Sequence, residues 1–285
     1  MFSRYSWKGP LVSWAAACML MFSYSGAPAG VVTGQVQCEF ACIIRNFGIS
    51  GVIDGQVVTD VEHLIAQAKQ RAVKRGKDSY IVNTHVKLNS PGGSVRDAIE
   101  LGRIFRKERL LADVSGAQCD SACVLVYAGA VVRYGRYTGG KIGIHQPYYE
   151  VPKDELNPDT FRKEYSAMLD ELRAYFREMN VAERLADEML KTSPREMRYL
   201  NPSEQDRFGL VIFDPVESEL SMLQDAKKLG IDRAEYYRRQ NLILKYCYPH
   251  PEDSLCYQTV METGKAPAAV PPSNADLSRF GAPVE

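Results

Sequence analysis

Apolar residues along this chain alternate between short β-branched runs and longer stretches with helical spacing. Residues 43–54 (IIRNFGISGVID), 79–90 (SYIVNTHVKLNS) and 110–117 (LLADVSGA) are apolar runs bounded by glycine or proline, which predicts buried strands. Between them, apolar positions recur every three or four residues from Asp60 to Ala72 and from Val95 to Phe105, which predicts helices. This alternation predicts an α/β fold of βαβ units with a mainly parallel sheet.

The second half of the chain continues with helical patterns. The predicted elements are a short helix at 122–130 (ACVLVYAGA), an amphipathic helix at 161–179, a short capped helix at 201–209, a last strand at 210–216 (LVIFDPV) and a helical extension at 216–262. Residues 263–285 are rich in alanine, proline and serine, and we expect this tail to be disordered.

The N-terminal residues have the layout of a secretory signal peptide. Arg4 and Lys8 precede a short apolar stretch at 11–22, and Ala27-Pro28-Ala29 offers a small-residue cleavage site. We therefore expect residues 1–29 to be removed and the protein to be periplasmic or secreted. The alternative is a membrane anchor formed by residues 11–24, although the apolar stretch is shorter than the ~20 residues of a spanning helix.

Composition excludes one class of function. The 285 residues contain 35 Lys and Arg and 35 Asp and Glu, so no overall charge attracts nucleic acid, and we expect no nucleic-acid partner. The hydrophobic fraction of 45% is enough for a globular core.

Cysteines beyond the signal segment fall into local pairs, an even count that favours disulfides in an exported chain. The candidates are Cys38 with Cys42, Cys119 with Cys123, and Cys247 with Cys256. The first pair belongs to a cysteine-containing segment at 30–42, and the last lies in the helical extension. Zinc is the alternative for the two C-x3-C pairs, and spacing alone leaves the connectivity open.

Three segments together carry the parts of a hydrolytic site: NSPGGSV (89–95), GAQCDSACVL (116–125) and IGIHQP (142–147). Ser121 stands between a strand and a helix, where it is either a nucleophile or a helix cap. His145 ends an alternating stretch and is either a general base or a structural histidine. The glycines of the PGG turn allow backbone N–H groups to approach a bound carbonyl, as in an oxyanion hole.

The order and spacing of these segments resemble the proteolytic subunit of Clp protease, a member of the ClpP/crotonase fold. NSPGG is followed by a serine 28 residues after Gly93 and by IHQP with its histidine 24 residues later. The resemblance covers residues 43–215 and includes LNPSEQDRFGLV (200–211). It implies a ClpP/crotonase-like domain of repeated βαβ units with a C-terminal helical extension.

The resemblance also implies roles for individual residues. Ser121 would be the nucleophile, His145 the general base, and the N–H groups of Gly93 and Ala122 the oxyanion hole. The family's third member, an aspartate, falls on Met197 in this chain, and Glu196 is the neighbouring carboxylate that we take as the candidate. The family's nucleophile turn lacks cysteines, so we expect Cys119 and Cys123 to brace the turn rather than to react.

These expectations lead to an exported, ATP-independent serine peptidase that cleaves peptides or unfolded proteins through an acyl-enzyme. It would need no cofactor, no metal and no ATPase partner, and it would form a homo-oligomer through residues 161–179. One alternative is a ClpP-like binding or scaffold protein with weak or no catalysis. A second, the acyl-CoA chemistry of the crotonase branch, is disfavoured by export and by the Ser121/His145 pair.

Overall fold

Helices and strands alternate through most of the structure. The computed structural model describes residues 28–39, 41–74, 84–148, 157–247 and 254–265. In chain order the elements are β1 (Val31–Cys38), β2 (Cys42–Ser50), α1 (Gly55–Lys74), β3 (His85–Asn89), α2 (Val95–Lys107), β4 (Leu111–Asp113), β5 (Gln118–Asp120), α3 (Cys123–Gly129), β6 (Val132–Tyr134), β7 (Lys141–Ile144), α4 (Pro158–Glu178), α5 (Arg184–Met189), β8 (Arg198–Tyr199), α6 (Pro202–Arg207), α7 (Pro215–Lys228), α8 (Arg233–Tyr246) and α9 (Ser254–Thr263).

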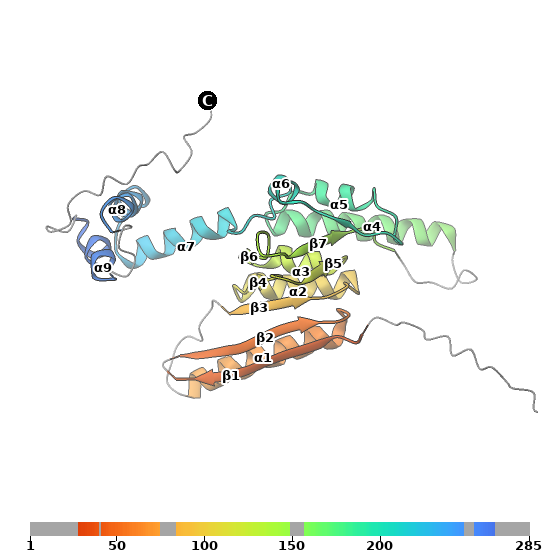
Figure 1. Cartoon of the computed structure of the whole chain (residues 1–285), viewed down its shortest axis with the longest axis horizontal. Helices are drawn as coiled ribbons and strands as arrows, with labels where there is room; N and C mark the ends of the chain where they lie inside the picture. Colours follow the sequence, from red (N-terminus) through yellow and green to blue (C-terminus); the bar gives the residue numbers. More distant parts are fainter. Residues whose placement is uncertain (1–27, 40, 75–83, 149–156, 248–253, 266–285) are drawn as a thin grey trace, which may run out of the picture.

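Two sheets organise these elements (Figure 1). In the larger sheet, of order β1-β2-β3-β4-β6, the pairs β2/β3, β3/β4 and β4/β6 are parallel, and β1 is an antiparallel edge strand. Helices connect its successive parallel strands, as the alternating pattern predicts. The smaller sheet, of order β5-β7-β8, pairs β5 with β7 in parallel and β7 with β8 in antiparallel fashion.

Several predicted boundaries are wrong. Helix α1 begins at Gly55 rather than near Asp60, because the Asp54 carboxylate accepts a hydrogen bond from the Val57 N–H and caps it there. The predicted strand at 110–117 shortens to β4, since the chain turns after Asp113. Within the segment 30–42, expected only to carry cysteines, Val31–Cys38 forms β1, and Cys42 begins β2.

The predicted last strand at 210–216 is also wrong. Only an isolated bridge joins Phe213 to Val132, because Asp214 caps α7 and Pro215 opens it. Asp214 is buried and forms ion pairs with Arg106 and Arg133. This cluster fixes the start of the extension against α2 and β6.

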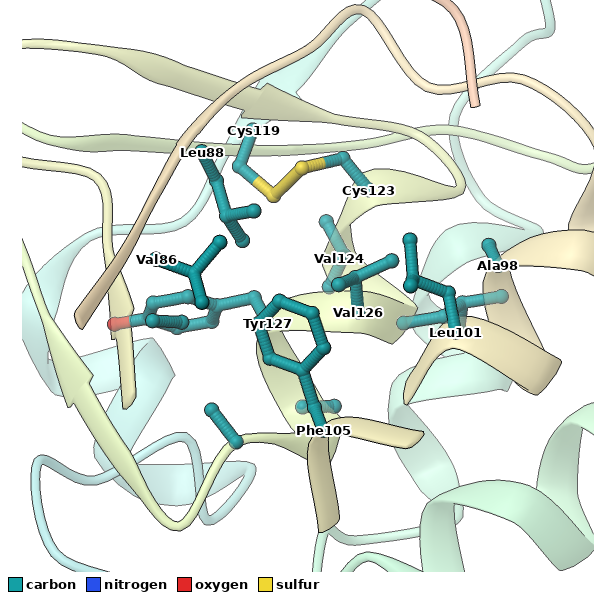
Figure 2. Close-up of a cluster of buried hydrophobic side chains, with 14 of the residues drawn as sticks. Val86, Leu88, Ala98, Leu101, Phe105, Cys119, Cys123, Val124, Val126 and Tyr127 are labelled. Carbon is teal, nitrogen blue, oxygen red and sulfur yellow. A yellow bond between two sulfur atoms is a disulfide. The ribbon is translucent and has the colours of Figure 1, made fainter. Parts of the chain in front are cut away.

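The main hydrophobic core lies between the larger sheet and helices α2 and α3 (Figure 2). Helix α3 is buried along its whole length, and its Gly129 meets α2 so closely that a Cβ there would lie 2.2 Å from the Gly102 carbonyl oxygen. The Tyr175 hydroxyl of α4 donates a hydrogen bond of 2.6 Å to the Leu125 carbonyl. These contacts fix the position of α3 and of Ala122, the residue at its N-terminal cap.

All six cysteines of the described chain form disulfides, joining Cys38 to Cys42, Cys119 to Cys123 and Cys247 to Cys256. The expectation that these cysteines form disulfides is confirmed, and the structure gives the connectivity that the spacing left open. Disulfides indicate an oxidising environment. The third bridge lies in a separate small core of α7, α8 and α9, which extend to one side of the sheets (Figure 1).

Two expectations concern residues outside the described chain. The signal segment is described only from Pro28, whose carbonyl accepts a hydrogen bond of 3.0 Å from the Val52 N–H, and the proposed anchor at 11–24 lies outside. Residues 266–285 of the tail expected to be disordered lie outside as well. Among the helices that the structure describes, none combines the length and apolarity needed to cross a membrane.

Candidate active site

Ser121 lies at the point where β5 ends and α3 begins, in an uncommon backbone conformation. Its φ of 55° falls in the left-handed region, which costs a non-glycine residue energy and is enriched at functional sites. Its N–H donates a hydrogen bond of 2.8 Å to the Gly143 carbonyl. Ser121 does not cap α3, because the cap position is Ala122 and no side chain bonds there.

The disulfide between Cys119 and Cys123 encloses this turn. Both cysteines are fully buried, and Figure 2 shows their bridge at the edge of the core, beside Leu88. Because both sulfur atoms are in the bridge, neither cysteine supplies a thiolate nucleophile. The bridge closes a short loop around Ser121 and ties both of its ends to the core.

His145 follows β7 and is brought to Ser121 by the parallel pairing of β5 with β7. Its Nε2 lies 2.6 Å from the Ser121 Oγ, within hydrogen-bonding distance. When Nε2 accepts a hydrogen bond from the Ser121 hydroxyl, the neutral ring carries its proton on Nδ1. The sequence alone offered Ser121 and His145 as separate candidates, and the structure brings them together.

The surroundings of His145 favour the neutral imidazole that a general base requires. Burial lowers the pKa of His145 below its ordinary 6.5, and the Pro194 carbonyl beside the ring partly offsets this effect. Nδ1 is buried, yet it makes no hydrogen bond of good geometry with any described residue. The structure therefore does not place Glu196 on the imidazole, and the Glu196 side chain is exposed.

Strand β8 places Met197 rather than Glu196 at the position opposite His145. Strand β8 pairs Tyr199 with Gly143 and Arg198 with Ile144, and one further step of this register puts Met197 opposite His145. The thioether of Met197 lies over Gly143, where a Cβ would be 2.8 Å from the sulfur. A thioether is only a weak acceptor, so it does not replace an aspartate.

The glycine turn packs directly on the nucleophile. A Cβ at Gly92 would lie 2.6 Å from the Ser121 Cβ and 3.0 Å from the Ala122 nitrogen, so only glycine fits. The N–H groups of Gly93 and Ala122 donate no hydrogen bond to any other described residue. Gly93 pairs with Ile53 only through the flanking Gly92 carbonyl and Ser94 N–H, which directs its own N–H away from Ile53.

Ser121 and His145 open into a cleft of about 610 Å³. Its walls come from the residues just before α1, the glycine turn and the segment after β7. The lining residues around the pair are Val52, Ile53, Asp54, Pro91, Gly92, Gly93, Ser94, Val95, Pro147 and Tyr148. Tyr148, which is 52% exposed, lies with its ring 5.8 Å from the His145 ring.

Sequence analysis missed three residues of this site. Gly92 was visible only as part of PGG, and the Pro194 carbonyl carries no side-chain signal. Tyr148 follows IHQP in the sequence, and its position three residues after a candidate base was the available clue. Within the described residues, no cluster of histidine, cysteine or acidic side chains is arranged to hold a metal ion.

Comparison with known proteins gives a resemblance in structure at low sequence identity. No protein-family model matches the chain. No curated protein matches it significantly. Among solved structures, a mutant of the 1510-N membrane-bound stomatin-specific protease is similar over 61% of this chain and 81% of that chain, with 16% sequence identity and a TM-score of 0.41. The resemblance does not define the chemistry of this chain, which depends on its own Ser121 and His145.

Proposed function

We propose that this protein is an exported serine peptidase of ClpP-like fold that hydrolyses peptide bonds through an acyl-enzyme without ATP. The observation that carries the proposal is the 2.6 Å distance between the Ser121 Oγ and the His145 Nε2, in an open cleft beside two N–H groups with no described partner. This combination supplies a nucleophile, a base and oxyanion donors.

The proposed reaction has two stages. In the first, His145 takes the Ser121 proton as Oγ attacks the scissile carbonyl, and the N–H groups of Gly93 and Ala122 stabilise the oxyanion. The imidazolium then protonates the leaving amine as the C–N bond of the tetrahedral intermediate breaks, which re-forms the carbonyl as an ester on Ser121. In the second stage water loses a proton to His145 and attacks the ester, releasing the acid and restoring the hydroxyl.

Catalysis in this scheme uses a Ser-His pair without a carboxylate. Burial keeps His145 neutral before attack, and the Pro194 carbonyl beside the ring is the group available to stabilise the imidazolium that forms. The Gln146 N–H donates a hydrogen bond of 2.9 Å to the Thr192 carbonyl, which joins the loop of Pro194 to the histidine segment. A rate below that of a full triad is expected.

Other features fit the proposal. Parallel strands connected by helices are what a ClpP-like domain requires, and the three disulfides fit an exported protein. Outside the cytosol no ATP drives an unfolding partner, so the substrates are short peptides or unfolded proteins. A homo-oligomer formed through α4 remains part of the proposal, and light scattering of the mature protein tests it.

Hydrolysis of an unfolded substrate tests the proposed function. The mature, oxidised protein should cleave a quenched fluorescent casein, and Ser121→Ala and His145→Gln should each reduce the rate by at least ~10²-fold. Asp170→Asn alters an exposed carboxylate of α4 that pairs with Arg173 and does not line the cleft, and it serves as the control. Equal rates for the wild type and Ser121→Ala would overturn the proposal.

A second candidate function is peptide binding without turnover. It is favoured by the absence of a hydrogen bond to the buried His145 Nδ1 among the described residues. In this case the protein would bind unfolded peptides in the same cleft, and the Ser121→Ala variant would bind them as tightly as the wild type. Failure to acylate Ser121, with binding retained, would favour this function.

A further inference from the structure

A groove between α2 and α4 continues the catalytic cleft. It has a volume of about 550 Å³, and four residues, Gly93, Ser94, Val95 and Tyr148, line both the groove and the cleft. The groove is therefore within reach of a side chain that neighbours a peptide carbonyl placed at Ser121.

One face of α4 forms the far wall of the groove. The residues that line it are Glu164, Ala167, Met168 and Glu171, at positions i, i+3, i+4 and i+7 of the helix. The middle two are apolar, and a carboxylate lies one turn away on either side. Such a surface accommodates an aliphatic stem at its centre and a positive charge at either end.

Charges along the cleft and the groove are predominantly negative. Asp54, Glu164 and Glu171 oppose one cation, Arg96, and Asp54 is the cap of α1. Neither glutamate forms an ion pair with a described residue. Arg103 lies close enough to Glu171 for an electrostatic interaction, but its guanidinium donates two hydrogen bonds to the Glu178 carboxylate.

Tyr148 adds a second feature suited to a cation. Its half-exposed ring lies where the groove meets the cleft, and an aromatic face attracts a lysine or arginine side chain. Val95 lies opposite on α2 and completes the apolar part of the wall.

We infer that the groove between α2 and α4 binds the side chain of a lysine or arginine adjacent to the scissile bond of the substrate. The stem packs on Ala167, Met168 and Val95, and the charge lies by Glu164 or Glu171. This inference deepens the proposed function and depends on substrates lying in the cleft. It makes Glu164 and Glu171 specificity-determining residues, with no part in the bond-breaking steps.

Peptides that differ in one side chain test the inference. Capped pentapeptides of alanine, with lysine or methionine placed at each position in turn, are offered to the mature protein, and KM and kcat are measured. Lysine should be preferred to methionine at one position, and Glu164→Gln or Glu171→Gln should raise KM for the lysine peptide roughly 2- to 5-fold. The methionine peptide and kcat should be unaffected.

Two variants provide the controls. Asp170→Asn removes a carboxylate next to Glu171 that points away from the groove and pairs with Arg173, and it should leave the preference unchanged. Arg96→Gln removes the opposing cation and should strengthen the preference for lysine. A general loss of fold would weaken both peptides alike, so these opposite effects separate binding from stability.

The binding of the same peptides to Ser121→Ala keeps the inference independent of catalysis. If the wild type cleaves nothing but Ser121→Ala still binds the lysine peptide more tightly than the methionine peptide, the proposed function fails and the groove assignment holds. Equal affinity for both peptides, or a lysine preference that persists unchanged in Glu164→Gln and Glu171→Gln, would overturn the groove assignment.

Discussion

The disulfide around Ser121 makes a sharp prediction, because the chain contains a matched control for it. Cys119→Ala/Cys123→Ala removes the bridge that encloses the nucleophile, and Cys38→Ala/Cys42→Ala removes a bridge of the same sequence separation, four residues. The second bridge closes the turn between β1 and β2 and does not line the cleft. The two variants therefore differ chiefly in distance from Ser121.

Loop closure sets the size of the stability effect. A bridge that closes a loop of about five residues is expected to stabilise the folded state by ~2 kcal/mol through the entropy of the unfolded chain. For a domain of this size that corresponds to a fall in Tm of roughly 4–8 °C. Cys119 and Cys123 are both fully buried, whereas Cys38 is partly exposed. Removing the bridge around Ser121 should therefore reduce stability at least as much as removing the other bridge.

The effect on catalysis should separate the two variants. The left-handed conformation of Ser121 costs about 1–2 kcal/mol, and without the bridge the turn is free to relax from it. A population shift of this size lowers kcat/KM roughly 5- to 30-fold. The Cys38→Ala/Cys42→Ala variant should keep the wild-type value at temperatures where it is folded.

Thermal unfolding followed by circular dichroism, together with kcat/KM at 20 °C, measures both effects. The proposed role of the Cys119–Cys123 bridge is supported if both variants lose stability and only the Cys119→Ala/Cys123→Ala variant loses activity. Equal activity of the two variants, with both folded, would refute the idea that this bridge holds the nucleophile.

Three further predictions follow from the electrostatics of single residues. Glu196→Gln should change kcat/KM by less than ~2-fold, because Glu196 is exposed and makes no hydrogen bond with His145 Nδ1; a loss of ~10²-fold would show that the carboxylate acts. Since burial lowers the pKa of His145 and only the neutral ring is a base, kcat/KM should rise with pH with a midpoint below 6.5, and a midpoint above 6.5 would contradict this. Burial opposes the ionisation of Asp214, but the Glu217 amide, Arg106 and Arg133 outweigh burial and lower the pKa of Asp214 below 3.8. The ionised Asp214 therefore stabilises the folded protein fully above pH 3.8, and this stabilisation is lost as the pH falls through the lowered pKa. Asp214→Asn should therefore reduce the free energy of unfolding at pH 7 by about 3–5 kcal/mol in urea, whereas a loss under 1 kcal/mol would contradict the role of the buried ion pairs.

Elements with a long, regular apolar pattern were predictable from the sequence. The stripes of α1, α2 and α4 repeat over several turns, and most buried residues of α1 and α2 lie on the predicted faces, whereas α4 buries only Leu172, Tyr175 and Phe176 near its C-terminal end. Strands β5, β6 and β8 have only two or three residues each, too few to show a period, and none of them was predicted. Asp214 and Pro215 are helix-start residues inside an apolar run, which explains the misread last strand.

The candidate site was predictable only in part. Ser121 and His145 could be singled out from local patterns, but their meeting depends on the pairing of β5 with β7, and β5 was not predicted. The role of Glu196 depends on the direction of its side chain, which the short strand β8 and the loop before it determine and which no local pattern encodes. The left-handed φ of Ser121 has no sequence signal, since serine at a strand-to-helix turn has no special preference for this conformation.

Reaction of the mature, oxidised protein with a fluorophosphonate probe tests the central claim most directly. Mass spectrometry of the peptide that contains Ser121 should show the adduct on its hydroxyl, and His145→Gln should slow labelling by at least ~10²-fold because the proton acceptor is gone. An unmodified Ser121 in folded protein, or a labelling rate that does not depend on His145, would contradict the proposed nucleophile and base.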